Sequence, residues 1–424
     1  MNAENAASAV TTTNAGWRYG LLGLPLAFVA LPLYVQLPNF YAREFGVPLA
    51  ALGALLLIAR LLDAVIDPWI GTWIDKLFAR STAAVLGVAA GAGIALALGF
   101  AWLFFPPVRG LNALLVWVTG GLLVTYTAFS VLTVAHQSWG AMLGGDDAER
   151  SRVFAWREGL GLVGVLLASV LPVLAGLHVT VGVLIATLAA GWWAWTRAAR
   201  PQMRAQDSHS VDWRTPFRHA QFRQLLAVFL LNGIASAVPA TLVLFFVQDR
   251  LQAPPAQEPI FLGTYFLFAA ASIPLWVRLV RRIGLARTWL AGMALAIAVF
   301  IWAATLGQGD GTAFIVICAL SGIALGTDLA LPSAMLAGVI ARANLGGRGE
   351  GIFFGWWNFA TKLNLALAAG IALPLLGLAG YAPGTRTPEA LTALTLAYCL
   401  LPCVLKCAAG TLLYFNSIRP GSPP

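Results

Sequence analysis

The sequence predicts an all-α membrane protein in which twelve transmembrane helices form two pseudo-symmetric six-helix bundles. Three observations carry this prediction: the composition, the spacing of apolar segments, and a repeat that relates the two halves of the chain. The chain is 59% hydrophobic and only 10% charged, whereas soluble domains carry about 25% charged residues. This composition excludes a soluble globular enzyme.

Twelve apolar segments are long enough to cross a bilayer, whose hydrocarbon core requires about 20 helical residues. They lie at approximately 18–37, 48–74, 82–105, 113–142, 154–176, 178–196, 222–247, 259–280, 288–306, 312–341, 352–379 and 389–415. The polar start of the chain runs straight into the first segment, so we expect no cleavable signal peptide.

The net charge of +9 does not indicate binding to nucleic acid, because the basic residues follow the loops. Nineteen lysines and arginines fall in alternate loops on one side, and four (Arg43, Arg109, Arg250 and Arg386) fall on the other. Cytoplasmic loops carry such an excess of positive charge. We therefore expect a multi-pass protein of the inner membrane with both termini cytoplasmic, and the lipid bilayer rather than nucleic acid as its surroundings.

Landmark residues repeat at a separation of 207 positions. The pairs are Pro32 and Pro239, Arg43 and Arg250, Pro48 and Pro255, Ala64 and Ala271, Trp69 and Trp276, and Arg80 and Arg287. Two halves in the same orientation, joined by a cytoplasmic loop, describe the major facilitator architecture, in which halves rock about a central substrate. The predicted domains are an N-terminal bundle at 1–196, a cytoplasmic linker at 197–221 and a C-terminal bundle at 222–424.

Two aspartates, Asp63 and Asp67, lie four residues apart inside the second apolar segment. Residues i and i+4 share one helix face, so both carboxylates should point into one space. An acid at that depth is costly unless it is paired, hydrated or neutralised. Arg60 is a possible structural partner, more readily for Asp63 than for Asp67. The equivalent positions in the second half are Ala270 and Pro274, which suggests that the coupling ion binds the N-terminal bundle.

Four motifs are spread over nearly the whole chain. They are Tyr19-Gly20, Arg60-x-x-Asp63-x-x-x-Asp67-Pro68-x-x-Gly71, Glu149-Arg150-x-Arg152 followed by Arg157, and Thr361-Lys362. These motifs resemble those of the glycoside–pentoside–hexuronide:cation symporter family, the relatives of the melibiose permease. The resemblance implies a symporter in which Asp63 and Asp67 bind the cation and Lys362 lies near them.

The chain departs from that family at several positions. Thr133-Val134-Ala135-His136 stands where relatives carry an aspartate or asparagine followed by a proline and an aromatic residue, and Ile66 replaces the melibiose carrier's asparagine beside the second acid. We therefore expect either H⁺ or Na⁺ as the coupling ion. Ser130 and Thr133 could supply further oxygens for Na⁺, but the loss of the asparagine favours a proton.

Further candidates for substrate binding or coupling lie in other helices. Lys362 is too deep to snorkel comfortably, and Asn358, Trp357 and Thr361 lie on or beside its face; this lysine could compete with the cation or pair with substrate. His136 is either a proton relay or the cap of a polar network near the cytoplasmic end.

The C-terminal half contributes fewer polar candidates. Asp328 could contact substrate, or it could be a hydrogen-bond partner for Lys362. Lys406 is expected to snorkel towards the cytoplasmic end. Asn232 and Ser236 share a face and could line a cavity, although polar side chains also join helices.

Charged residues at the cytoplasmic helix ends form a predicted gate of ion pairs that break and reform. They are Asp75, Lys76, Arg150, Arg152, Arg157 and Glu158. Gly71-x-x-x-Asp75-Lys76 with Arg80 also looks like a loop signature shared across the superfamily.

These observations predict a monomeric secondary transporter that couples uptake of a sugar-like or glycoside-like small solute to H⁺ or Na⁺ by alternating access. No nucleophile–base pair or phosphate-binding loop indicates an enzyme, and we expect no cofactor and no metal site; the stripe Cys399, Cys403 and Cys407 is interpreted as helix packing. Two alternatives stay open: a carrier of amphiphilic or lipid-like substrates, and a non-transporting membrane sensor or scaffold.

Overall fold

The computed structural model describes residues 16–201, 212–382 and 384–419. Within these residues the chain is helical and contains no strand. Nine helical stretches of this described part are long and apolar enough to cross a membrane. The predicted all-α membrane architecture is confirmed, whereas the count of twelve spans stays a prediction.

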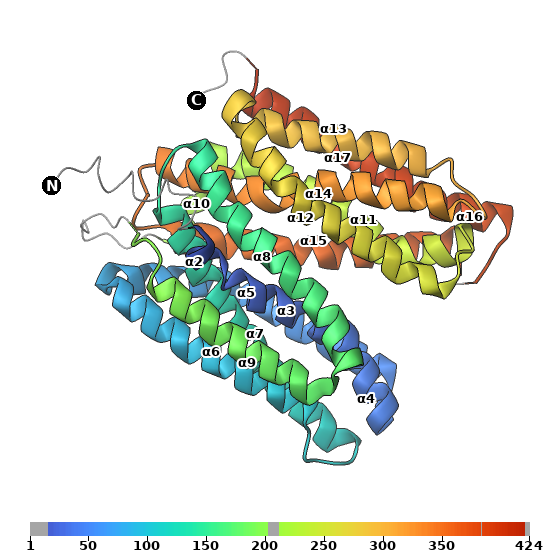
Figure 1. Ribbon diagram of the computed structural model, residues 1–424, viewed down its shortest axis with the longest axis horizontal. Helices are drawn as coiled ribbons and strands as arrows, with labels where there is room; N and C mark the ends of the chain where they lie inside the picture. Colours follow the sequence, from blue (N-terminus) through green and yellow to red (C-terminus); the bar gives the residue numbers. More distant parts are fainter. Residues whose placement is uncertain (1–15, 202–211, 383, 420–424) are drawn as a thin grey trace. The chain divides into compact units, whose positions relative to one another are not determined.

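The chain divides into two compact units. Unit 1 combines Met1–Pro216 with Ala337–Phe359, and unit 2 combines Phe217–Leu336 with Ala360–Pro424. Two long helices, α14 (Gly311–Arg342) and α15 (Glu350–Leu378), therefore divide their residues between the units. Figure 1 shows both helices in the orange part of the colour sequence.

Unit 1 begins with a broken helical segment. It consists of α2 (Gly16–Gly20), α3 (Gly23–Leu31), the π-helical turn η1 (Pro32–Gln36) and α4 (Leu37–Phe45). Proline lacks the N–H that an α-helix needs, and Pro32 and Pro38 account for the changed turn geometry around η1. The segment ends at Gly46, whose φ of 66° is the left-handed conformation that glycine adopts without strain.

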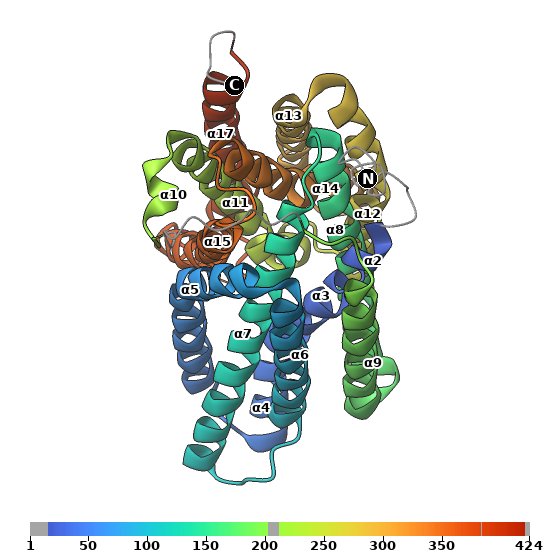
Figure 2. The ribbon, with the colours of Figure 1, turned by 90° about the vertical axis from the view of Figure 1, so that its left-hand side faces the viewer.

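Five long helices complete the N-terminal part of unit 1. They are α5 (Leu49–Arg80), α6 (Thr82–Phe104), α7 (Leu111–Met142), α8 (Asp147–Leu174) and α9 (Gly176–Thr196). Helix α6 packs against both α7 and α9 (Figure 2), and α5 packs against α7. Fully buried rings, including Phe100, Trp139 and Trp195, fill the core of this unit. The second and fourth predicted segments are therefore direct neighbours.

Unit 2 is built on the helices that follow the short α10 (Thr215–Arg218). They are α11 (Ala220–Phe245) with the π-helical turn η2 (Phe246–Arg250), the 3-10 turn η3 (Pro255–Gln257), α12 (Glu258–Ile283), α13 (Leu285–Ala303), and the final run of α16 (Pro388–Thr395), η4 (Leu396–Leu400) and α17 (Leu401–Ser417). Helix α17 packs against α11 and α13. A separate buried core that includes Leu242, Phe246 and Phe314 stabilises this unit.

Candidate functional site

The two acids of α5 are buried. The exposed fraction is 5% for Asp63 and 0% for Asp67, whereas Leu62 and Trp69 on the same helix are 51% and 59% exposed. Helix α5 therefore turns an apolar face outward and both acids inward, as the i, i+4 spacing predicts.

Helix α7 brings hydroxyl groups to the acids. Ser130 donates a hydrogen bond of 2.8 Å to Oδ1 of Asp63. Helices α5 and α7 run parallel because α6 returns the chain between them, so Thr133, one turn after Ser130, lies at the level of Asp67. Thr133 is buried, and its hydroxyl has no hydrogen-bond partner among the described residues. Two helices thus offer two carboxylates and two hydroxyls in neighbouring turns.

The first turns of α15 cross α5 at three glycines, Gly71 of α5 and Gly351 and Gly355 of α15. A Cβ on Gly71 would collide with the carbonyl of Gly351, and a Cβ on Gly355 would lie 2.6 Å from the carbonyl oxygen of Asp67. Small residues permit such close approach of helix backbones. Asp67 therefore lies where α5 and α15 cross.

A hydrogen bond between side chains lies one turn beyond Thr133 on α7. Asn358 of α15 donates a hydrogen bond of 2.9 Å to the side-chain oxygen of Gln137. Asn358 and its neighbour Trp357 are both buried. Gln137 was not among the predicted site residues, and the one signal in the sequence was its position a turn after Thr133 on a mostly apolar helix.

Asp75, a predicted gate residue, caps the start of α15. Its carboxylate accepts hydrogen bonds from the N–H groups of Gly351 at 2.6 Å and Ile352 at 2.9 Å. The first N–H groups of a helix have no partner within the helix and carry partial positive charge. Beside it, Glu350 precedes the predicted span 352–379 and accepts N–H groups of its own loop. Burial raises the pKa of this carboxyl to about 7.

The other predicted gate residues lie at the end of α5 and on α8. Lys76 is exposed and Arg152 is half-buried. Arg157 and Glu158 form an ion pair, and Nη1 of Arg150 lies 3.7 Å from a carboxylate oxygen of Asp147. Both ion pairs join residues of α8 itself, and the role of these charged residues as a gate stays a prediction.

His136 is fully buried in α7. Its Nε2 lies 2.8 Å from the carbonyl oxygen of Tyr19, the Tyr19 hydroxyl donates to the His136 carbonyl at 2.9 Å, and the two rings stack at 4.1 Å. Trp195 meets the imidazole edge-on. These contacts join α2 to α7, and the proposed role of His136 as a proton relay stays a prediction.

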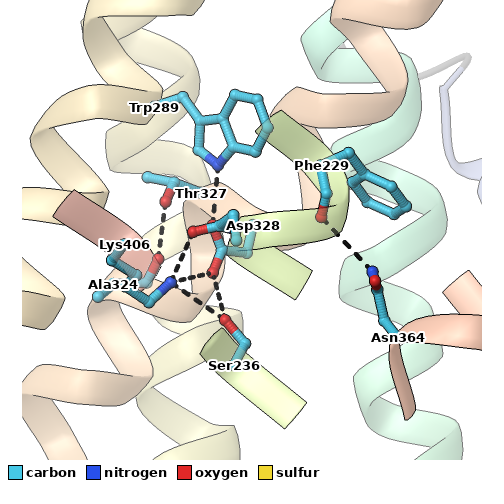
Figure 3. A network of polar contacts seen from close by, with 9 residues as sticks. Phe229, Ser236, Trp289, Ala324, Thr327, Asp328, Asn364 and Lys406 are labelled. Carbon is cyan, nitrogen blue, oxygen red and sulfur yellow. Dashed lines mark hydrogen bonds and ion pairs between the residues drawn. The ribbon is translucent and has the colours of Figure 1, made fainter. Parts of the chain in front are cut away.

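Unit 2 contains a separate buried polar network, drawn in Figure 3. Nζ of Lys406 lies 3.1 Å from Oδ2 of Asp328 and donates to Asn232 and Ser236 at 2.8 and 3.1 Å. The Asp328 carboxylate also accepts hydrogen bonds from Asn232, Ser236 and Trp289 at 2.8–3.1 Å. Carboxylate, ammonium, amide and hydroxyl groups satisfy one another in this network.

The network corrects one expectation, because Lys406 is only 4% exposed and does not snorkel. Its ammonium group is the charged partner of Asp328, for which a bond to Lys362 had been one of the open alternatives. The physical reason is that α11 and α14 place acceptors at the level of Lys406, and neither helix is near α17 in sequence. Trp289 gave no sequence signal beyond its indole N–H.

Thr361 and Lys362 belong to unit 2. Thr361 is exposed and Lys362 is half-buried. The role of Lys362 beside the α5 acids stays a prediction.

Buried carboxylates and a satisfied polar network inside a bundle of apolar helices define a membrane solute carrier, because such groups mark substrate and ion pathways. A family model described as "MFS/sugar transport protein" matches residues 17–419. The chain belongs to this family, and the resemblance inferred from the helix motifs is confirmed.

Several curated proteins are similar to the chain. The "Glucuronide carrier protein homolog" of Escherichia coli is 24% identical over 95% of this chain and 92% of that protein. The "Putative glycoside/cation symporter YagG" of Escherichia coli is 23% identical over 91% and 88%. The "Inner membrane symporter YicJ" of Escherichia coli is 27% identical, but the match covers 37% of this chain and 33% of that protein.

Solved structures establish the fold. A bacterial homologue of the iron transporter ferroportin superposes with a TM-score of 0.72 over 95% of this chain and all of that chain, at 15% identity. The Escherichia coli fucose:proton symporter FucP superposes with a TM-score of 0.63 over 93% and 96%, also at 15% identity. At this identity the likeness shows the major facilitator fold alone.

Proposed function

We propose that this protein is a cation-coupled symporter of glycoside-like solutes that works by alternating access. The observation that carries the proposal is the pair of buried carboxylates on α5, with Ser130 bonded to one of them. Two relatives named as a glucuronide carrier homolog and a putative glycoside/cation symporter support the class of solute.

The coupling follows from the electrostatics of the acid pair. Two carboxylates one helical turn apart repel each other, and a charge at this depth in a membrane is costly unless it is neutralised. A bound cation neutralises this charge and reduces the cost of closing the surrounding helices around the solute. Release of the cation on the other side restores the charge and resets the carrier.

The coupling ion is H⁺ or Na⁺. A proton needs only one carboxylate oxygen, and the fully buried Asp67 is the candidate. Na⁺ needs several oxygens, and Asp63, Asp67, Ser130 and Thr133 would be its ligands. Imposing the two gradients separately distinguishes these cases.

The test is Asp67→Asn in proteoliposomes. The amide keeps the size of the side chain but cannot take up a proton and binds Na⁺ weakly, so we expect gradient-driven accumulation of labelled phenyl β-D-glucoside or phenyl β-D-glucuronide to be abolished. Uptake down the solute gradient should continue, because the substitution leaves the helix packing intact. Uptake is measured with a proton gradient, with a sodium gradient and with neither.

Asp310→Asn is the matched control, since Asp310 is exposed and its carboxylate accepts a hydrogen bond from the N–H of Gly307 in the loop before α14, which an amide oxygen can also accept. This variant should accumulate solute like the unmodified protein. Full accumulation by Asp67→Asn would refute the coupling role. Flux of a labelled lysolipid without flux of either glycoside would instead support a carrier of amphiphiles.

A further inference from the structure

Unit 2 contains a partly open cavity of about 190 Å³ beside the Asp328–Lys406 network. Helices α11 to α14, η4 and α17 all contribute to its wall. Five aromatic rings line it: Phe261, Tyr265, Phe266, Phe300 and Tyr398. The polar groups Ser236, Asp328 and Lys406, which bond to one another as Figure 3 shows, form one polar patch on this mostly apolar wall.

The polar patch favours an uncharged ligand. Asp328 and Lys406 neutralise each other, and the three contacts of the ammonium group are already made within the network. An ionic group that displaced one partner would leave the other charge buried and uncompensated, which is strongly unfavourable. The Asp328 side chain retains 14% exposure, so a neutral hydroxyl can still approach it.

The size and the wall favour a ring. An engineered apolar cavity of about 150 Å³ binds benzene, so this slightly larger cavity accommodates one six-membered ring and a substituent. Aromatic walls attract such a ring by stacking and edge-to-face contacts. Tyr398 is itself held in place, because its ring stacks on Phe246 with centroids 4.3 Å apart.

Two hydrogen-bonding groups remain available in the cavity. Among the described residues, the phenol hydroxyls of Tyr265 and Tyr398 have no hydrogen-bond partner, although both residues line the cavity. Tyr398 belongs to the π-helical turn η4, and such turns recur at functional sites. The cavity therefore combines an apolar wall with free donors, which suits a neutral ring that carries an oxygen atom.

We propose that this cavity binds the apolar ring of an aglycone, so that the solutes are glycosides of phenol-like rings rather than free sugars. The claim that the solute is a glycoside rests on the proposed function. The claim that the cavity binds a ring rests only on the cavity itself. The glycosidic oxygen of such a solute accepts the hydrogen bond that a tyrosine hydroxyl offers.

The test measures binding to the purified full chain by calorimetry with three probes: phenyl β-D-glucoside, methyl β-D-glucoside and phenol. Ala296→Phe adds a ring to the cavity wall, because Ala296 is buried and lines the cavity. We expect this variant to bind phenol and the phenyl glucoside at least tenfold more weakly, while its affinity for the methyl glucoside is unchanged. Ala298→Phe, on an exposed position of the same helix, is the matched control and should bind all three probes normally.

Tyr398→Phe removes one hydroxyl and keeps the ring, so it tests the cavity without adding volume. Loss of one hydrogen bond should weaken phenol binding about 2- to 10-fold. Equal affinities of the unmodified protein, Ala296→Phe and Tyr398→Phe for phenol would overturn the ring site. If phenol binding depends on Ala296 while neither glucoside binds or is transported, the ring site stands and the proposed glycoside function is wrong.

Discussion

Asp328 and Lys406 show how one buried contact depends on several helices. Nζ of Lys406 lies 3.1 Å from Oδ2 of Asp328. Asn232 and Ser236 of α11 form hydrogen bonds with both side chains. Removing one partner of a buried ion pair leaves an uncompensated charge, whereas removing both charges is often nearly neutral. The stability of the pair is therefore a property of the network and not of either residue.

Lys406→Met should destabilise the protein by about 3–5 kcal/mol, because Asp328 would be left charged and without its cation. The double variant Lys406→Met with Asp328→Asn should regain most of this loss. Thermal unfolding of the purified protein measures both. Lys76→Met, at an exposed lysine, is the control and should leave the stability unchanged. If the double variant lost as much stability as Lys406→Met and Asp328→Asn lose separately when added together, the account would be contradicted.

At the scale of the element, the crossing of α5 and α15 determines where Asp67 lies. A Cβ added to Gly355 would lie 2.6 and 2.9 Å from backbone atoms of Asp67 and Pro68. A Cβ added to Gly370 on the same helix would have no neighbouring atom within 4 Å. Glycine costs helix stability relative to alanine by about 1 kcal/mol. The close approach of the α5 and α15 backbones therefore explains the glycine at position 355, whereas helix propensity does not.

Gly355→Ala and Gly370→Ala should have effects of opposite sign. Alanine at 370 should be neutral or stabilising by up to about 1 kcal/mol, while alanine at 355 must force α5 and α15 apart. We expect Gly355→Ala to lower the thermal midpoint and to impair cation-driven uptake. Equal midpoints for the two variants would show that the helices do not approach as closely as described.

At the scale of the whole molecule, charge distribution predicts orientation. Nineteen basic residues lie in the loops of one predicted side and four in those of the other, and basic loops stay in the cytoplasm. With this orientation, Asp75, Glu350 and the α8 ion pairs are predicted to lie at the cytoplasmic end of unit 1.

Reporter fusions test this orientation. A fluorescent protein fused to the C-terminus should fluoresce and alkaline phosphatase there should be inactive, because the first folds in the cytoplasm and the second needs the oxidising periplasm. Fusions at Arg386, in the loop predicted to be periplasmic, should give the reverse. Active phosphatase at the C-terminus would overturn the predicted topology.

The sequence by itself determined the architecture and one half of the site. A membrane helix is determined by its own segment of sequence, because in lipid the backbone N–H and C=O groups must form their hydrogen bonds within that segment. Composition and the lengths of the apolar segments were therefore sufficient to predict the fold class. The inward direction of Asp63 and Asp67 followed from helix periodicity for the same reason, and the motif spacing was sufficient for the family.

Only the tertiary structure decided the partners. Gln137 with Asn358, Asp75 with the start of α15, and Lys406 with Asp328 join residues 78 to 276 positions apart. No periodicity encodes such pairs, because they depend on which helices cross and at what level. Packing therefore buries Lys406, which was expected to reach the surface, and it forms the aromatic cavity that no local pattern had indicated.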